Sequence, residues 1–170
     1  MLSDASWLKF VTVRDPAARL MSASKQKIHD MNDSPEMLRK YAADLQVHPT
    51  ALSNVSFRSF VQLVTERLPH VNDHYRPQIE QCGLRAHLHR YVVVDITEDA
   101  MLQRTIKFLM TRLQSFSPAF DQLGDVSDAL TYASSAEHIT HGFDAVSQQP
   151  FDTLSSIHRA YADDYVMLKS

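Results

Sequence analysis

Several features that carry chemistry in other proteins are scarce in this sequence. Its 170 residues include one cysteine, Cys82, and three glycines. A single cysteine excludes an intramolecular disulfide. Gly83, Gly124 and Gly142 all lie outside Gly-x-Gly and Gly-x-x-x-x-Gly-Lys patterns. The chain therefore has no Gly-rich loop for cradling phosphates.

Long apolar runs and an excess of basic charge are also missing. No run reaches 18 apolar residues, so the sequence predicts no membrane span. The first four residues, Met-Leu-Ser-Asp, lack the pattern that opens a signal peptide. A formal net charge of -3 argues against non-specific nucleic-acid binding, which needs a basic face. With 44% hydrophobic and 22% charged residues, the composition is typical of a globular chain of one domain.

Two short apolar, β-branched segments are predicted to form buried strands, residues 8–13 and 91–96. A helix start follows each of them. Asp15 suits an N-cap and Pro16 the first helical position, which predicts a helix from 16 to about 29. Thr97 can cap a second helix, with Glu98 in its first turn. Strands that alternate with helices predict an α/β fold with parallel pairing.

Other segments show helical spacing of apolar residues. Further helices are predicted at about 35–46, 56–68 and 151–163, and loops at 47–55, 70–83 and 115–149. In the second of these helices, Phe57, Phe60, Val61 and Val64 form a stripe that we assign to the core. A sheet of two strands is small and leaves its edges uncovered, which favours self-association.

Arg14 stands where the first predicted strand ends and the first helix begins. Ligands collect beyond the carboxyl ends of parallel strands, and a helix N-terminus attracts anions. Arginine can bind two oxygens of one phosphate or sulfate, and Ser22, two turns along, could add a hydroxyl. Alternatively, Arg14 pairs with an acid such as Asp15, and the residues alone leave both readings open. The spacing of Asp15 and Arg19 predicts an ion pair within the helix.

The segment Arg14-Asp-Pro-x-x-Arg-Leu-x-Ser-Ala resembles the 3′-phosphate-binding segment of the Golgi-type carbohydrate sulfotransferases. Three later features fit the same family in order. His74-Tyr-Arg-Pro-Gln, with Cys82 nearby, is similar to its His-Trp-x-Pro segment. Tyr91 followed by Glu98 resembles its strand ending in a glutamate. Tyr161-Ala-Asp-Asp-Tyr165 resembles its C-terminal signature. The resemblance spans residues 7–168.

This resemblance implies one sulfotransferase domain over residues 1–170, with a P-loop-like nucleotide-binding parallel sheet flanked by helices in a predominantly helical chain. It implies 3′-phosphoadenosine 5′-phosphosulfate (PAPS) as donor and no metal. Arg14 and Ser22 would hold the donor's 3′-phosphate. The acceptor would be a hydroxyl of a glycan or glycoconjugate, and the location the Golgi lumen or membrane.

Two residues are candidates for the chemistry. His74 lies in the segment that resembles the family's acceptor side, and its ordinary pKa suits a general base. Glu98 could orient a partner at the end of the second strand, although an acid in a first helical turn also has a structural reason to be there. Arg76 could meet an anionic sugar or remain a surface arginine. Tyr161 and Tyr165 are expected to pack the last helix.

The family also has an upstream donor site, a strand, loop and helix that supply a lysine for the 5′-phosphosulfate. Only six residues precede Trp7, so we expect the domain to be incomplete at its N-terminus. The placement of Lys9, Lys25 and Lys27 does not match that lysine. A fragment, a truncated gene model and a degenerate member all remain open. The alternative function is a non-catalytic fold remnant that binds adenosine 3′,5′-bisphosphate or a protein partner.

Histidine pairs complete no recognisable metal site. His87 and His89 share a face only in an extended segment, and His138 and His141 only in a helix. Neither pair has the cysteines or carboxylates that would complete four zinc ligands.

Overall fold

The computed structural model describes residues 9–29, 34–53, 55–68, 70–97, 103–105, 107–108, 111 and 146–169. Strand β1 (Phe10–Val13) pairs with β2 (Val92–Asp95) in a parallel sheet of two strands. The register runs from Phe10 opposite Val92 to Val13 opposite Asp95. The predicted parallel pairing is therefore present, and each strand begins and ends within two residues of its predicted bounds.

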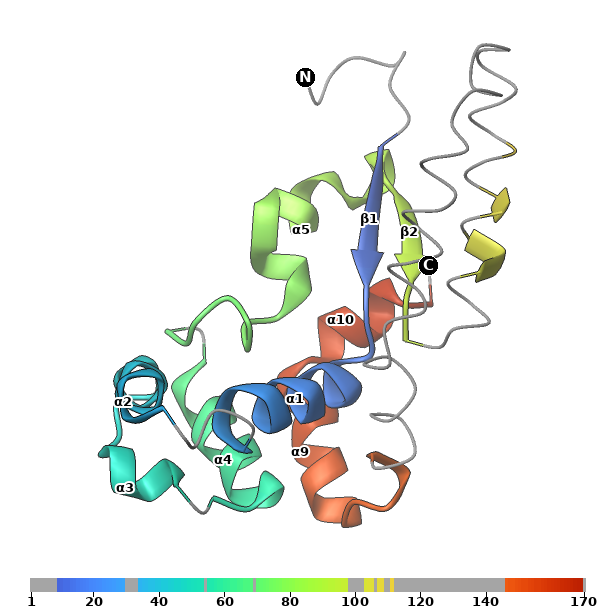
Figure 1. The fold of residues 1–170 in the computed structure, drawn as a ribbon. Helices are drawn as coiled ribbons and strands as arrows, with labels where there is room; N and C mark the ends of the chain where they lie inside the picture. Colours follow the sequence, from blue (N-terminus) through green and yellow to red (C-terminus); the bar gives the residue numbers. More distant parts are fainter. Residues whose placement is uncertain are drawn as a thin grey trace.

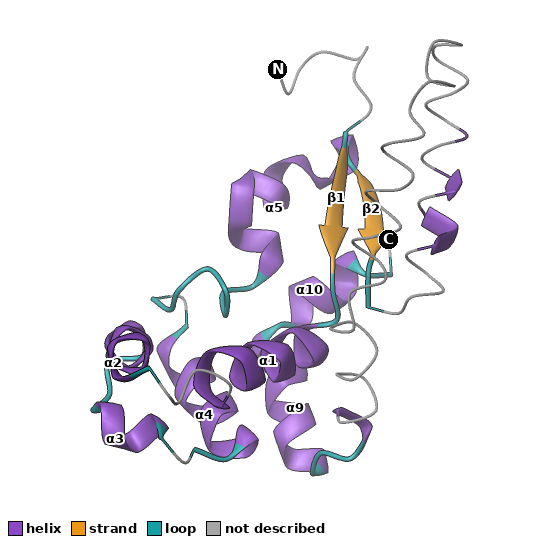
Figure 2. Cartoon of the chain, viewed as in Figure 1, coloured by secondary structure: helices purple, strands orange, loops and turns teal. Residues whose placement is uncertain are grey.

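Helices make up most of the remaining described residues (Figure 2). They are α1 (Pro16–Ser24), α2 (Pro35–Asp44), α3 (Pro49–Leu52), α4 (Phe57–Arg67), α5 (Leu84–His87), α9 (Phe151–Ala160) and α10 (Ala162–Met167). A π-helical turn (Lys25–His29) extends α1, and 3-10 turns (Gln78–Gly83 and Leu88–Arg90) flank α5. In Figure 1, α1, α4 and α9 gather beyond the carboxyl ends of both strands.

Local signals at the helix starts explain where two of these helices begin. The Asp15 carboxylate accepts a hydrogen bond from the N–H of Ala18 at 2.9 Å, and Pro16 opens α1. The Ser56 hydroxyl accepts from the N–H of Ser59 at 3.2 Å at the start of α4. Each side chain satisfies a backbone donor that has no partner within its own helix.

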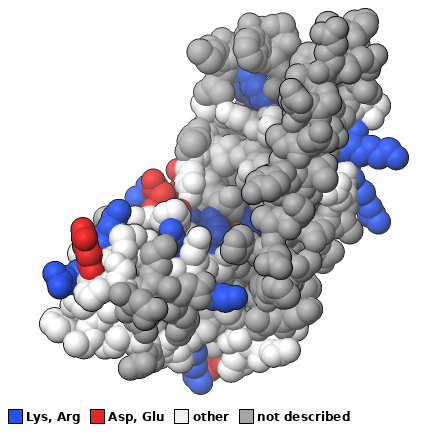
Figure 3. Space-filling model, viewed as in Figure 1, with Lys and Arg blue, Asp and Glu red and all other residues white. Residues whose placement is uncertain are grey.

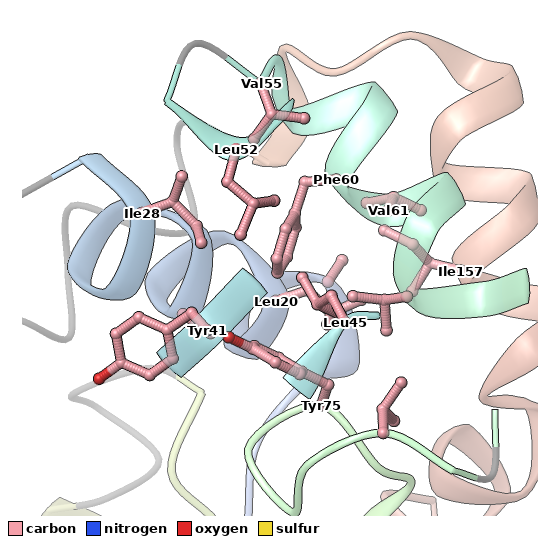
Figure 4. Packing of buried hydrophobic residues seen from close by; sticks show 14 of the residues in the cluster. Leu20, Ile28, Tyr41, Leu45, Leu52, Val55, Phe60, Val61, Tyr75 and Ile157 are labelled. Carbon is pink, nitrogen blue, oxygen red and sulfur yellow. The ribbon is translucent and has the colours of Figure 1, made fainter. Parts of the chain in front are cut away.

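The main core lies between the helices (Figure 4). Its fully buried side chains include Leu20 of α1, Leu45 after α2, Phe60 of α4 and Ile157 of α9. The ring of Phe60 meets that of Tyr75 edge to face, with 5.5 Å between the centroids. The predicted core stripe of α4 is thus confirmed, and burial of these large apolar groups is the main force that holds the helices together.

A second, smaller cluster holds the sheet against the C-terminal helix. Val13, Ile79, Leu84 and Met167 are all buried there. Val13 is the last residue of β1, so this cluster fixes the position of the residue that comes next, Arg14. The carboxyl end of β1 is therefore packed against both the 78–83 turn and α10.

Several sequence predictions need correction. The first strand is not buried along its length: Phe10 is 51% exposed, and within β1 only Val13 is buried. The predicted loop at 47–55 contains α3. The predicted helix at 151–163 is interrupted at Tyr161 and continues as α10. The sheet of two strands in a mostly helical chain does not by itself confirm a P-loop-like fold. Most of the helix expected after Thr97, and most of 115–149, lies outside the described residues.

Candidate functional site

A cavity of about 240 Å³ opens where β1 passes into α1. One wall comes from α1 and its π-helical extension, and the other from the segment between α4 and α5. Three of the four predicted site residues line it, although 52 residues separate Ser22 from His74 in the chain. The fourth, Glu98, lies outside the described residues. The polar and charged side chains of the cavity wall include Arg14, Arg19, Ser22, Lys27, His74 and Gln78.

Arg14 reaches this cavity from the carboxyl end of β1. Its backbone N–H donates to the Gln78 side-chain oxygen at 3.0 Å. Its Nε and Nη2 are buried and have no hydrogen-bond partner in the described part of the chain. Burial lowers the pKa of Arg14, and the nearby Asp15 charge partly opposes that shift. A buried guanidinium with unpaired N–H groups is costly, and an anionic ligand would relieve the cost.

The alternative reading, in which an acid neutralises Arg14, finds no ion pair among the described residues. Asp15 is used elsewhere. Its carboxylate caps α1, and its backbone N–H donates to the Thr97 hydroxyl at 2.7 Å, which ties the start of α1 to the end of β2. Arg14 therefore lines the cavity and makes no ion pair with any described acid.

Arg19 does not pair with Asp15, contrary to the prediction. Its Nη2 lies 3.2 Å from Asp164 Oδ2, and the Asp164 side chain is 1% exposed. The guanidinium also lies over the ring of Tyr161, 5.6 Å from its centroid. Burial lowers the pKa of Arg19, and the attraction of Asp164 opposes that shift. Asp15 is occupied as a helix cap, and a buried carboxylate such as Asp164 needs a cationic partner more than a half-exposed one does.

His74 lies at an exposed edge of the cavity. Its backbone N–H donates to the Asn72 side chain at 3.0 Å. The adjacent Asp73, an acid of the cavity wall, pairs with Arg76 at 3.3 Å. Arg76 is therefore engaged in a surface ion pair in this structure. Because Asp73 already has a cationic partner, the charge left on the lining is positive.

The face of the molecule that carries β1 and α1 has basic side chains at several places (Figure 3). Figure 3 shows more Lys and Arg than Asp and Glu surface among the described residues of the face that carries β1 and α1. Lys27 contributes to the cavity wall, and its Nζ lies over the Tyr41 ring, 5.6 Å from the centroid. A local positive site is thus present in a chain whose formal net charge is -3.

Sequence reasoning missed several cavity residues. Arg19 and Gln26 lie three and four positions from Ser22, so helical spacing could have identified them. Lys27 lies five positions from Ser22 and joins the cavity wall from the π-helical turn, which the sequence did not predict. Gln78 stands in the segment that resembles the family's His-Trp-x-Pro motif, but nothing in the sequence indicated its contact with Arg14. It reaches Arg14 through a hydrogen bond between residues 64 positions apart, and only the tertiary fold creates that contact.

Two classes of site are not found among the described residues. No group of three or more His, Cys, Asp or Glu side chains there could hold a metal ion. In the same part of the chain, no helix has the length and apolar character to cross a membrane.

Tyr161 is buried as predicted, and its hydroxyl donates to the backbone oxygen of Tyr75.

Comparisons with known proteins identify a family. The model described as "Sulfotransferase family" matches residues 2–169. A segment of 82 residues is 33% identical to carbohydrate sulfotransferase 14 of Mus musculus. That segment covers 45% of this chain and 22% of the relative, so the match spans about a fifth of the relative's length. No solved structure matches the chain.

Proposed function

Because the chain belongs to the sulfotransferase family, we propose that it moves a sulfuryl group from PAPS to a hydroxyl group of a carbohydrate. The carbohydrate acceptor is suggested by the similarity to carbohydrate sulfotransferase 14. The observation that carries the proposal is the cavity beside Arg14. The Arg14 guanidinium, two of whose nitrogens have no partner among the described residues, shares this cavity with Ser22 and His74, the residues proposed for donor and acceptor.

On the donor side, Arg14 and Ser22 bind the 3′-phosphate of PAPS. The unpaired Nε and Nη2 of Arg14 fit a doubly charged phosphate, which offers several acceptor oxygens. Both nitrogens are closed to water in this arrangement, so the side chain must turn toward the cavity as the phosphate enters. The N-terminus of α1, with Asp15 and Pro16, adds a favourable dipole in the same region.

On the acceptor side, His74 is the proposed general base. Transfer breaks the bond between sulfur and the bridging oxygen of the donor and forms a bond between sulfur and the acceptor oxygen. The acceptor hydroxyl must lose its proton, and a ring nitrogen of His74 takes it. The exposed position of His74 gives an acceptor sugar access to the cavity. Glu98 is kept as a second proposed catalytic residue and lies outside the described residues.

The proposal extends to partners and location. The acceptor is a glycan or glycoconjugate, no metal takes part, and the protein works in the Golgi lumen or at its membrane, as the resemblance to the carbohydrate sulfotransferases implies. Membership of the sulfotransferase family favours this transferase over a non-catalytic remnant of the fold. Self-association through the small sheet remains a separate proposal.

Calorimetric titration with adenosine 3′,5′-bisphosphate, the donor product, tests the phosphate site. We expect the wild-type protein to bind it and Arg14→Ala to bind about 10- to 100-fold more weakly. This range corresponds to the loss of hydrogen bonds between a charged donor and a charged acceptor, about 1.5–3 kcal/mol. His74→Ala should leave this affinity nearly unchanged and reduce sulfate transfer, measured with labelled PAPS and a panel of glycans.

The matched control is Arg58→Ala. Arg58 is also an arginine, but it is 64% exposed, pairs with Asp152 and lines a different cavity. It should bind the nucleotide as the wild type does. The phosphate assignment is wrong if the wild type shows no binding, or if Arg14→Ala and Arg58→Ala bind equally well.

A further inference from the structure

Asp164 is a buried carboxylate outside the set of proposed site residues. It belongs to the first turn of α10, and its side chain is 1% exposed. Its Oδ2 accepts from the Gln78 N–H at 2.8 Å, and its Oδ1 from the Ile79 N–H at 2.9 Å. Oδ2 also accepts from Arg19 Nη2 at 3.2 Å. Three charge-assisted hydrogen bonds therefore offset the cost of burying this acid.

The hydrogen bonds continue from Asp164 to the anion site. The backbone N–H of Gln78 donates to Asp164, and the side chain of Gln78 makes two hydrogen bonds to the end of β1. Its Oε1 accepts from the Arg14 N–H at 3.0 Å, and its Nε2 donates to the Thr12 oxygen at 3.3 Å. Asp164 is thus connected to Arg14 through one residue, although the carboxylate and the Gln78 backbone are 86 residues apart in sequence.

Contacts of Asp164 and its neighbour Tyr161 reach both walls of the cavity. Arg19 extends from α1 to the carboxylate and lies over the Tyr161 ring. The Tyr161 hydroxyl donates to the backbone oxygen of Tyr75, next to His74. The short break between α9 and α10 is therefore attached to both chain segments that carry the proposed donor and acceptor residues.

We propose that Asp164 is a positioning residue for the anion site, holding Gln78 and Arg19 so that Arg14 is presented to the donor phosphate. This inference rests on the proposed function. Asp164 pairs with Arg19 of the cavity wall, whereas Arg14 makes no ion pair with a described acid. A carboxylate with a purely structural role could form its hydrogen bonds with residues anywhere in the core, without any of them lining the cavity. Two of the three groups that it binds, Gln78 and Arg19, belong to the cavity wall.

Two substitutions interrupt this connection at different points. Asp164→Asn replaces one acceptor oxygen with an amide that faces N–H donors. Gln78→Met keeps the length of the side chain and the backbone N–H, and removes the two side-chain hydrogen bonds to the backbone of Arg14 and Thr12. We expect each to weaken binding of adenosine 3′,5′-bisphosphate about tenfold, the effect of losing one or two such hydrogen bonds. The double variant should be no more than about twofold weaker than the worse single variant, because residues acting through one connection are not additive.

A core variant separates positioning from general destabilisation. Ile157→Ala removes a fully buried side chain from the main core and should lower the melting temperature while the dissociation constant stays within about twofold of wild type. If Asp164→Asn does not fold, Gln78→Met decides by itself.

Wild-type affinity in Gln78→Met, or a loss in Asp164→Asn no larger than in Ile157→Ala, overturns the positioning role. Additive losses in the double variant overturn it too. Those results differ from failure of the proposed function, in which the wild type does not bind or Arg14→Ala has no effect. In that case both proposals fall.

Discussion

Removing the hydroxyl group should lower stability at one of two buried tyrosines and not at the other. Tyr161 is 1% exposed, and its hydroxyl donates to the buried backbone oxygen of Tyr75. Tyr75 is fully buried, and its own hydroxyl has no hydrogen-bond partner among the described residues. Phenylalanine keeps the ring in both places. The two substitutions therefore differ in whether the lost hydroxyl was paired.

The magnitudes depend on that difference. Tyr161→Phe leaves the Tyr75 backbone oxygen without its donor, which should lower the free energy of unfolding by about 1–3 kcal/mol. Tyr75→Phe removes a buried polar group that makes no hydrogen bond to a described residue. The relief of that penalty is partly offset by the lost packing of one oxygen atom, so we expect a change between zero and a gain of about 1 kcal/mol.

Urea unfolding at neutral pH measures both values. The dependence of the free energy on urea concentration should be the same in the wild type and both variants, so that the midpoints report stability directly. Tyr161→Phe should unfold at lower urea than the wild type, and Tyr75→Phe at equal or higher urea. Equal losses in the two variants would refute the assignment of paired and unpaired hydroxyls.

Two further predictions concern the backbone and the effect of high pH. Gly83 has a φ of +69°, so Gly83→Ala should cost about 1 kcal/mol of unfolding free energy; the added Cβ would meet His87 Cδ2 at an ordinary 3.6 Å, and an unchanged urea midpoint would contradict this. Burial raises the pKa of Tyr75, Tyr161 and Tyr165 above the ordinary value of about 10. Burying these hydroxyl groups in their neutral form therefore leaves the free energy of unfolding at its full value below pH about 10. That free energy falls as the pH rises above about 10, because the unfolded chain then loses these protons more readily than the folded protein does. Ultraviolet titration should show these three ionising together with unfolding, and their ionisation in the native protein near the ordinary pKa would refute the burial.

Much of the local structure could be predicted because its causes lie within one or two helical turns. Asp15 and Pro16 start α1, and Ser56 starts α4, through contacts with residues three positions away. The parallel pair of strands could be inferred from alternation with helices. The break at Tyr161 was missed: the apolar spacing runs through it, and the buried hydroxyl contact with Tyr75 depends on another part of the chain.

The candidate site was also predicted only in part. Sequence pattern and resemblance were enough to select Arg14, Ser22 and His74, and the cavity brings these three together, while their roles remain proposals. The prediction that Phe10 is buried was wrong. An apolar, β-branched sequence indicates that a segment forms a strand, but it does not indicate which parts of the chain pack against that strand.

The sequence alone was enough for the starts of α1 and α4, the order of the two strands and the longer helices, and the placement of a cation where β1 ends, since each depends on neighbours along the chain. Tertiary structure alone decided that Arg19 pairs with Asp164, 145 residues away, and that Gln78 holds the Arg14 backbone. The physical reason is that an ion pair or hydrogen bond forms with whichever group the packed chain brings within reach and shields from water. Spacing in the sequence does not specify that group.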